Sequence, residues 1–373
     1  MNIREIRSIY IHFPFCRHLC NYCDFYKNIP KNKEKEYEAY EASLVKGFAL
    51  LTDLLKENDS TLGALNTLYL GGGTPSLWGE RGAAFLKNFL LDRNIILGPS
   101  CEFTFEVNPG GWTEEGLLAW RDIGVNRYSL GIQSLNPHFL KLIDRVHNIE
   151  DVHETLNYFS SKKLSFSVDF MLGLPFSKKF KRDIISELEE ILVHDPEHIS
   201  LYILTTKAGY IHKDHLPDDE YIEGEYLRVS NFLIKRGYDH YEVSNFSKKG
   251  KESNHNLQYW KSESVAALGP SATGFLKEAQ TRFKWKMTQV DFVLEKLTAE
   301  EMKLEEVYMA LRINRPFDLS MFTDNLLELE KVLDLWQERK LLNTRAGSTI
   351  SLNSNGFLIL DSLMDDLFKH ELV

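Results

Sequence analysis

The sequence predicts an α/β protein: a partial parallel β/α barrel of about six units, followed by a small helical, winged-helix-like domain. Short β-rich runs alternate with helical patterns as far as Leu204, which is typical of parallel strands joined by right-handed crossovers. About six such units are too few to close the usual eight-stranded barrel, so we expect a partial one. Beyond Thr298 the pattern becomes mainly helical, which indicates a second, smaller unit.

The predicted strands are rich in β-branched and aromatic residues and stop at turn residues. Ser8–Phe13, for example, alternates in polarity and ends at Pro14. The further strands are Thr67–Leu70, Glu102–Val107, Asn126–Leu130, Ser165–Met171 and Glu197–Leu204. Apolar residues three or four positions apart predict the intervening helices. These are Glu34–Lys56, Arg81–Leu91, Thr113–Asp122, Pro137–Ile143, Asp151–Lys162, Lys179–His194 and Glu220–Arg236.

We expect three regions: the barrel at 1–235, a connecting region at 236–297 and the small domain at 298–373. In the last region, Leu326–Arg339 has helical spacing and Ser362–His370 forms a final helix. A hairpin is predicted between Thr349–Leu352 and Phe357–Leu360, with the turn at 353–356. The acidic character of this region makes it a poor candidate for DNA binding.

Composition narrows the function classes. The 373 residues contain 44 Lys and Arg against 54 Asp and Glu, a net charge of −10, which disfavours nucleic acid as the main partner. Three of the four cysteines lie close together in the sequence, a pattern that does not indicate a set of disulfide bonds. We therefore expect a protein of the reducing cytoplasm. We predict neither a signal peptide nor a membrane span, because no apolar run is long enough.

The bunched cysteines are Cys16, Cys20 and Cys23, directly after the first predicted strand. Clustered thiolates suit a soft metal or an iron–sulfur cluster. Three ligands would leave one iron of a four-iron cluster free to bind a small molecule. Two alternatives are a zinc site, with His18 or Asp24 as an awkward fourth ligand, and cysteines that serve only as small core residues.

Unusual residues follow successive predicted strands. The cysteine loop follows the first strand and the glycine run Gly71–Gly73 the second; Glu106, Gln133 and Asp169 lie at the ends of the next three. In parallel barrels the active site forms at the carboxyl ends of the strands. A single Glu or Asp at a strand end is usually a turn or cap residue. Because five successive strands all end in such unusual residues, we expect them to form one active site.

The spacing Cys-x3-Cys-x2-Cys after a strand resembles the radical S-adenosylmethionine (SAM) superfamily, and Gly71–Pro75 is similar to its glycine motif. Within that superfamily the chain resembles oxygen-independent coproporphyrinogen III oxidase and its relatives. The resemblance implies a four-iron four-sulfur cluster on the three cysteines, with SAM on the open iron and cleaved by one electron. The matching stretches are Tyr10–Cys16, Leu70–Ser76, Glu106–Pro109, Leu130–Gln133, Arg145 and Asp169–Pro175.

The resemblance also implies the residues that contact SAM. Glu106 would accept a hydrogen bond from the ammonium group and Arg145 would pair with the carboxylate. Asp169 and Gln133 would hydrogen-bond to ribose or adenine, and Tyr22 would lie beside the adenine. A solvated arginine at a helix end is the alternative for Arg145. The full implied set is Tyr10, Tyr22, Gly72, Gly73, Thr74, Glu106, Gln133, Arg145 and Asp169.

Two departures separate the chain from the oxidase. Phe25 stands where the oxidase has a fourth cysteine, and Tyr10 lies too near the start for the oxidase's N-terminal extension. Both features are similar to the HemW-type heme chaperones, whose His-Asn-x-x-Tyr-Trp motif resembles 255–260. That resemblance implies that His255 ligates heme iron while Tyr259 and Trp260 form an apolar wall.

Other readings of this motif stay open. The histidine and its two aromatic neighbours could simply pack the junction between domains. Ser253 and Thr273 stand where some relatives have Cys and His, so a second heme ligand is not identified.

The favoured function implied by the resemblance is a cytoplasmic heme chaperone that passes heme to an acceptor protein, with a one-electron donor as a further partner. The first alternative is an enzyme, the oxidase, which converts coproporphyrinogen III propionates to vinyl groups by radical decarboxylation. Whether the chain is an enzyme is therefore open. A third class, tRNA-modifying radical enzymes, would favour a basic surface, which the net charge of −10 opposes.

Overall fold

A computed structural model describes residues 3–207 and 209–373, and its largest element is a nine-stranded sheet. Six parallel strands are neighbours in the order of the sequence, from β1 to β6. The six predicted strand–helix units are therefore confirmed. The strands are β1 (Arg4–Phe13), β2 (Ser60–Gly72), β3 (Leu97–Val107), β4 (Arg127–Gln133), β5 (Phe166–Leu172) and β6 (His198–Ile203).

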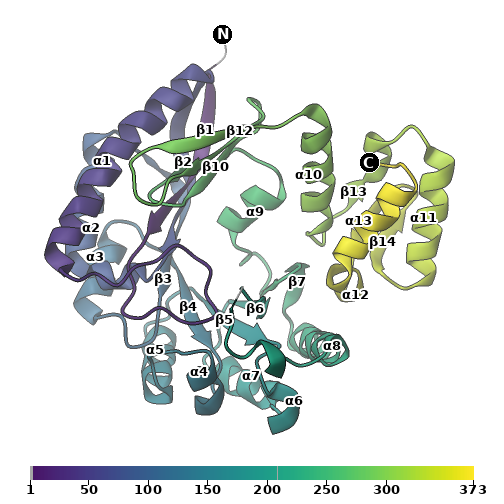
Figure 1. The fold of residues 1–373 in the computed structure, drawn as a ribbon, viewed down its shortest axis with the longest axis horizontal. Coiled ribbons are helices and arrows are strands. Elements are labelled where there is room, and N and C mark those ends of the chain that lie inside the picture. Colours follow the sequence, from purple (N-terminus) through teal and green to yellow (C-terminus); the bar gives the residue numbers. More distant parts are fainter. Residues whose placement is uncertain (1–2, 208) are drawn as a thin grey trace.

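Helices cover one face of this sheet, the outer side of the arc that the strands form in Figure 1. Alternate residues of β1 explain the two faces. Ile9, Ile11 and Phe13 join the apolar core, whereas Tyr10 and His12 point to the concave side. The helices are α1 (Lys33–Glu57), η1 (Pro75–Trp78), α2 (Gly79–Asp92), α3 (Glu114–Asp122), α4 (Pro137–Leu142), α5 (Ile149–Ser161), α6 (Ser177–Phe180), α7 (Ile184–Leu192), η2 (Lys213–His215) and α8 (Asp219–Lys235).

The segment after α8 adds to both edges of the same sheet. Strands β7 (Asp239–Glu242) and β8 (Asn245–Ser247) extend it antiparallel beyond β6, whereas β9 (Ala266–Leu268) pairs parallel with β1 at the opposite edge. Helix α9 (Asn254–Trp260) lies between them, inside the arc (Figure 1). The sheet keeps two edge strands, so the predicted partial barrel is confirmed.

A small antiparallel sheet follows β9 and leads to the last domain. It consists of β10 (Thr273–Leu276), β11 (Thr281–Trp285) and β12 (Phe292–Lys296). The C-terminal domain has its own apolar core around the fully buried Trp336. Its elements are α10 (Ala299–Leu311), β13 (Phe317–Asp318), η3 (Leu319–Phe322), α11 (Leu326–Glu338), β14 (Leu342–Ala346), β15 (Thr349–Leu352), α12 (Ser354–Leu358) and α13 (Leu360–Lys369).

This combination of helices and a three-stranded sheet is the winged-helix-like arrangement that the sequence predicts, but the predicted hairpin partner is wrong. β15 pairs with β14, which precedes it, and residues 357–360 are helical. The Asn353 side chain accepts hydrogen bonds from two backbone N–H groups and so caps α12. Phe357, Leu360 and Leu363 then recur at helical spacing in the buried core. In the part of the chain that is described, no helix is long and apolar enough to cross a membrane.

Candidate functional site

The concave face of the sheet is lined by polar side chains. Because side chains alternate along a strand, each strand places apolar residues under the helices and polar ones toward the interior of the arc. The interior residues from β2 to β6 include Thr67, Tyr69, Glu102, Thr104, Glu106, Arg127, Ser129, Ser167, Asp169, His198, Ser200 and Tyr202. A polar interior of this kind needs either a ligand or other protein groups to satisfy its hydrogen bonds.

The cysteine loop between β1 and α1 is closed at its base. Asn28 accepts a hydrogen bond from the backbone N–H of Cys16 at 2.9 Å. Cys16 and Cys20 are buried, Cys23 is half-buried, and the Thr74 hydroxyl lies 3.6 Å from the Cys16 thiol. Burial raises the pKa of the Cys16 thiol to about 11 and also raises the pKa of Cys20. Burial therefore favours the protonated form of the Cys16 and Cys20 thiols, which a metal would have to displace.

The three cysteines line one cavity of about 280 Å³. No group of three or more Cys, His, Asp or Glu side chains surrounds a single ion position in residues 3–207 and 209–373. Each cysteine of a four-iron cluster binds a different iron, so the thiols need not converge on one point. A second cavity, of about 380 Å³, adjoins the first. The residues that line both are Tyr22, Cys23, Gly72, Gly73, Asn108 and Arg145.

The glycine run at the end of β2 packs directly under the cysteine loop. A Cβ atom at Gly73 would lie 2.5 Å from the carbonyl oxygen of Phe15, and one at Gly72 would lie 2.5 Å from the His12 ring. Gly72 also has a φ of +114°, in the region that favours glycine. These positions therefore exclude side chains, and the close contact leaves backbone exposed on the cavity wall.

Two carboxylates line the second cavity. Glu106 accepts hydrogen bonds from the Tyr69 hydroxyl and the Gly72 N–H, both at 2.9 Å. Asp169 accepts one from the Ser129 hydroxyl at 3.0 Å. Burial, and then the charge of Asp169, raises the pKa of Glu106 to about 7; burial raises the pKa of Asp169 to about 6. Such carboxylates are poised to bind a cationic or hydroxyl-bearing ligand.

Arg145 lies between the two cavities. One of its terminal nitrogens, Nη2, donates to Asn108 Oδ1 at 2.7 Å and to the Gly131 carbonyl at 2.6 Å. The other, Nη1, has only long contacts, 3.4 Å to the Tyr22 hydroxyl and 3.9 Å to the Cys20 thiol. One edge of the guanidinium is therefore held in place, and the other faces the cavities with capacity to pair with an anion.

Most of the remaining predicted residues converge on the same cavities. Gln133 is 8 % exposed, lines the second cavity, and has a φ of +70°, a strained value for a residue with a side chain. Tyr22 lines both cavities. Tyr10 lines neither: its hydroxyl is hydrogen-bonded to His12 Nδ1 at 2.9 Å, and its ring packs on Tyr69.

Helix α9 places the predicted heme motif beside Thr67 and Glu102, on the amino-terminal side of Tyr69 and Glu106, which we call the amino end of the concave face. His255 is 1 % exposed, and its ring contacts the Thr67 hydroxyl at 2.8 Å and the Tyr259 hydroxyl at 3.4 Å. The Glu102 carboxylate accepts the backbone N–H groups of residues 254 and 255. Burial lowers the pKa of His255 to about 3, so the ring is neutral. Trp260 lies at the end of the helix and is half-buried.

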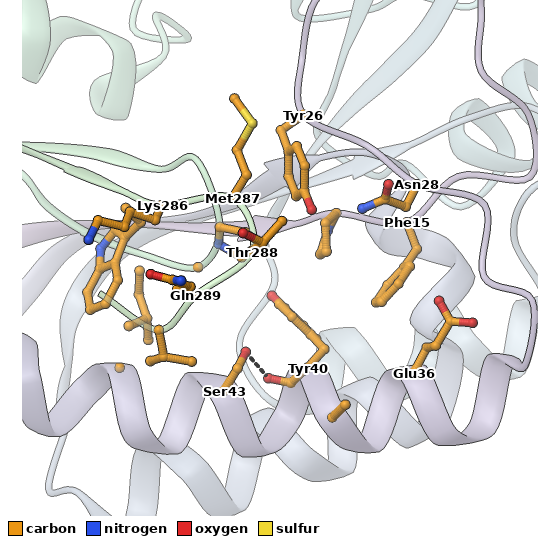
Figure 2. A pocket seen from close by; sticks show the side chains of 18 residues that line it. Phe15, Tyr26, Asn28, Glu36, Tyr40, Ser43, Lys286, Met287, Thr288 and Gln289 are labelled. Atoms are coloured by element: carbon orange, nitrogen blue, oxygen red, sulfur yellow. Dashed lines mark hydrogen bonds between the residues drawn. The ribbon is translucent and has the colours of Figure 1, made fainter. Parts of the chain in front are cut away.

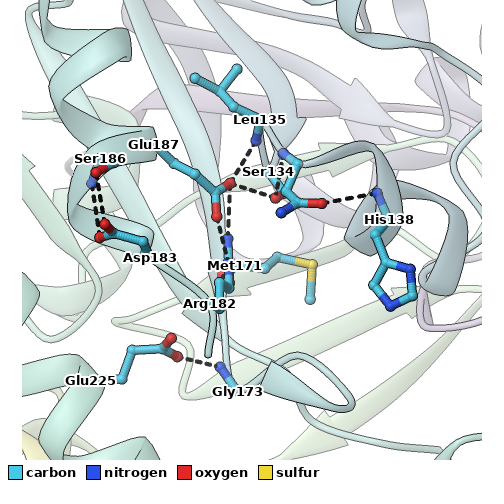
Figure 3. A network of polar contacts seen from close by, with 11 residues as sticks. Ser134, Leu135, His138, Met171, Gly173, Arg182, Asp183, Ser186, Glu187 and Glu225 are labelled. Carbon is cyan, nitrogen blue, oxygen red and sulfur yellow. Dashed lines mark hydrogen bonds and ion pairs between the residues drawn. The ribbon is translucent and has the colours of Figure 1, made fainter. Parts of the chain in front are cut away.

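A buried ion pair holds the segments that follow β4 and β5. Arg182 donates to Glu187 at 2.7 Å and to the Met171 carbonyl at 2.6 Å. Glu187 in turn accepts hydrogen bonds from the Ser134 hydroxyl and the Leu135 N–H (Figure 3). Because these contacts lie directly after Gln133 and near Asp169, they stabilise the backbone of the second cavity's wall.

A separate cavity of about 280 Å³ lies between α1 and the turn before β12. Figure 2 shows Tyr40 and Ser43 on α1 facing the turn that carries Thr288 and Gln289. It contains none of the predicted cysteine, SAM or heme residues.

Sequence reasoning missed several residues of the site. Tyr69, Ser129 and Tyr202 lie on the polar face of their strands, so strict alternation could have found them. Asn108 positions Arg145 and also donates to Thr74 at 2.8 Å. No local pattern indicates the Arg182–Glu187 pair, because its partners come from three separate segments.

Comparisons with known proteins agree with this geometry. Residues 10–185 match the family model described as "Radical SAM superfamily". The heme chaperone HemW of Bacillus subtilis is 32 % identical over 332 residues, which cover 82 % of this chain and 83 % of that protein. HemW of Lactococcus lactis is 29 % identical, with 98 % of this chain and 99 % of that protein covered.

The solved structure of coproporphyrinogen III oxidase (HemN) from Escherichia coli, described as a radical SAM enzyme, has a similar fold. It superposes with a TM-score of 0.79 at 19 % identity, covering 97 % of this chain and 90 % of that one. A likeness at this identity supports the fold of both the barrel and the C-terminal domain.

Proposed function

We propose a function for this chain on the basis of its family: it belongs to the HemW heme chaperones, within the radical SAM superfamily. The proposed function is that of a heme chaperone, which holds a four-iron four-sulfur cluster, SAM and heme and passes heme to an acceptor protein. The observation that supports the cluster and SAM is that three cysteines, the glycine run and two carboxylates surround two adjoining cavities. The relatives named as heme chaperones support heme as the cargo.

Cys16, Cys20 and Cys23 would hold the cluster, which when bound can supply an electron to SAM. The free edge of Arg145 is suited to the methionine carboxylate, because Asn108 and Gly131 already fix its other edge. Glu106 and Asp169 would accept hydrogen bonds from the remaining polar groups of SAM, and Gln133 would add another. Tyr22, which lines both cavities, would pack against the adenine.

His255, Tyr259 and Trp260 remain the proposed heme residues. A neutral imidazole is the form that ligates iron, which agrees with the lowered pKa of His255. However, Thr67 contacts Nδ1 of this ring and Tyr259 contacts Nε2. Either nitrogen could bind iron only if α9 moved away from the strands. Tyr259 and Trp260 are both half-buried, whereas His255 is buried.

We further propose the cytoplasm as the compartment, because free thiols and an iron–sulfur cluster need reducing surroundings. The proposed partners are an acceptor protein that receives heme and a protein that donates single electrons.

An anaerobic assay distinguishes the chaperone from the oxidase. Reconstituted protein is titrated with hemin and, in parallel, incubated with coproporphyrinogen III, SAM and a reductant. We expect a shifted Soret band and no protoporphyrinogen. Conversion of coproporphyrinogen III at rates of about 1 per second or more, typical of enzymes, would overturn the chaperone proposal.

His255→Ala tests the histidine. We expect an altered Soret band and weaker hemin binding, with the cluster retained. Thr67→Val is the matched control, because it removes the same hydrogen bond and leaves the imidazole in place. If both variants change the spectrum equally, His255 acts only through packing, and the heme iron is bound elsewhere.

A further inference from the structure

A fourth cavity, of about 210 Å³, lies where the end of α9 meets the C-terminal domain. It is distinct from the cofactor cavities, because none of the cysteine, glycine or carboxylate residues described above lines it. One side is apolar and partly aromatic, and is contributed by both parts of the chain. The apolar lining residues are Trp260, Ala310, Ile313, Pro316 and Phe317.

Two cationic side chains lie at the same cavity, Lys261 from the end of α9 and Arg315 from the segment after α10. Burial, and then the charge of Arg315, lowers the pKa of Lys261, and the charge of Glu263 partly offsets this. Throughout the described ranges, neither has a carboxylate within 4.0 Å, although Glu306 also lines the cavity. Two neighbouring cations without an ion pair are suited to an anionic ligand.

The backbone that carries these cations is held firmly. Asn314 donates its N–H to the Tyr241 carbonyl at 2.8 Å, and Val243 donates to the Arg312 carbonyl at 3.0 Å. Lys261 is the C-cap of α9, bonded through its own N–H to the last turn. These hydrogen bonds place the backbone of residues 261 and 315 at the cavity.

Trp260 forms the aromatic wall of the cavity. The Arg312 guanidinium lies 4.4 Å from the centre of its ring, which fixes the indole plane. The indole N–H is buried and lacks a hydrogen-bond partner among the described residues. A flat aromatic wall, an unpaired donor and two cations together fit a planar apolar molecule that carries carboxylates at one edge.

We propose that this cavity binds the carboxylate-bearing edge of a tetrapyrrole, with Lys261 and Arg315 pairing with its carboxylates and Trp260 contacting its ring. This inference rests on the proposed heme-chaperone function and gives it a location. Because the cavity is smaller than a whole tetrapyrrole, most of the ring would stay outside it, where an acceptor protein could reach it.

The test is a Soret titration of the full-length protein with hemin and with hemin dimethyl ester, whose carboxylates are blocked. We expect the double variant Lys261→Gln/Arg315→Gln to bind hemin about 10-fold more weakly than the wild type. The dimethyl ester should bind the wild type and the variant equally, because neither carboxylate can pair. Lys249→Gln/Lys369→Gln changes the net charge equally at exposed positions that form no ion pair with any described residue, and should bind hemin normally.

The outcomes separate the inference from the function. If the wild type binds hemin and the double variant binds it equally well, or if the ester binds the wild type as tightly as hemin does, the cavity assignment is wrong and the chaperone function stands. If the wild type binds no hemin at all, the proposed function fails first. A loss of hemin affinity in the control variant would show a general charge effect and would also overturn the assignment.

Discussion

The two ends of the concave face use the same alternation of polar residues in different ways. At the carboxyl end, Glu106 and Asp169 line a cavity, and burial keeps their pKa values raised although hydrogen-bond donors partly offset it. At the amino end, Glu102 accepts two backbone N–H groups from α9, and His255 contacts Thr67. The carboxyl end is left for a ligand, whereas the amino end is filled by the protein's own chain.

This difference teaches that a polar interior face does not by itself locate a binding site. Both Glu102 and Glu106 accept hydrogen bonds from the backbone, but α9 covers Glu102, whereas Glu106 also lines a cavity. A carboxylate with a raised pKa retains capacity for a ligand, because a cationic ligand stabilises its charged form. The following predictions test whether the two ends really differ in this way.

The largest effect concerns the cysteines at the carboxyl end. Anaerobically reconstituted wild type should carry about four irons, and each of Cys16→Ala, Cys20→Ala and Cys23→Ala should lose the cluster. Iron and sulfide analysis with electron paramagnetic resonance measures this. Cys101→Ala is the control and should keep the cluster, because Cys101 is buried in the apolar core on the other face. Loss of the cluster in that variant would contradict the assignment.

The next effect separates the carboxylates at the carboxyl end, Glu106 and Asp169, from Glu102 at the amino end. Glu106→Gln should weaken SAM binding by about 10- to 100-fold, because a charge-assisted hydrogen bond is lost. Asp169→Asn should act in the same direction. Equilibrium dialysis with cluster-loaded protein measures both. Glu102→Gln makes the identical change at the amino end and should leave SAM affinity unaltered; equal losses at the two ends would remove the distinction between them.

Stability should respond in the opposite way. Thr67→Val and Glu102→Gln should lower the free energy of unfolding by about 1–3 kcal/mol, because each leaves a buried partner in α9 without its hydrogen bond. Asp169→Asn should be neutral or stabilising, because it removes a carboxylate with a raised pKa. Urea unfolding of the cluster-free proteins measures these differences. A destabilised Asp169 variant beside an unchanged Thr67 variant would reverse the comparison.

The smallest effect is the pH dependence of Glu106. Its pKa in the folded protein, about 7, lies above the ordinary value of 4.5, so its cost to stability grows as the pH rises from 4.5 to about 7 and is constant above that. Glu106→Gln should therefore stabilise the cluster-free protein by about 1 kcal/mol at pH 8. The gain should shrink as the pH falls through 7 and vanish near pH 4. A gain that stays constant across this range would mean that charge is not its cause.

Chain order and local pattern made much of this structure predictable. Each of the six parallel strands is a short β-rich run, and each pairs with its neighbour in sequence, as β1 does with β2. The carboxyl ends of such strands must share one side of the sheet, so Glu106, Gln133 and Asp169 could be grouped without knowledge of distances. The spacing of the three cysteines lies within one loop and needs no tertiary information.

Other features were not predictable because they depend on distant partners. The pairing of β9 with β1 joins Ala266 to Ile9, and no local signal specifies that contact. The hairpin in the C-terminal domain was predicted wrongly because the sequence of Thr349–Leu352 does not specify whether it pairs with the segment before it or the segment after it. Likewise, the sequence around His255 does not reveal whether its ring contacts a ligand or, as in the structure, the hydroxyl of Thr67.

The sequence by itself determined the alternation of strands and helices, the loop of three cysteines and the residues that end each strand, because these follow from backbone geometry and local spacing. Only the tertiary structure decided which of the polar residues remain available. Glu106 and Asp169 face a cavity, while Glu102 and His255 are paired across the interior. The physical reason is that availability depends on which groups fill the space opposite each side chain, and those groups come from segments more than 100 residues away along the chain.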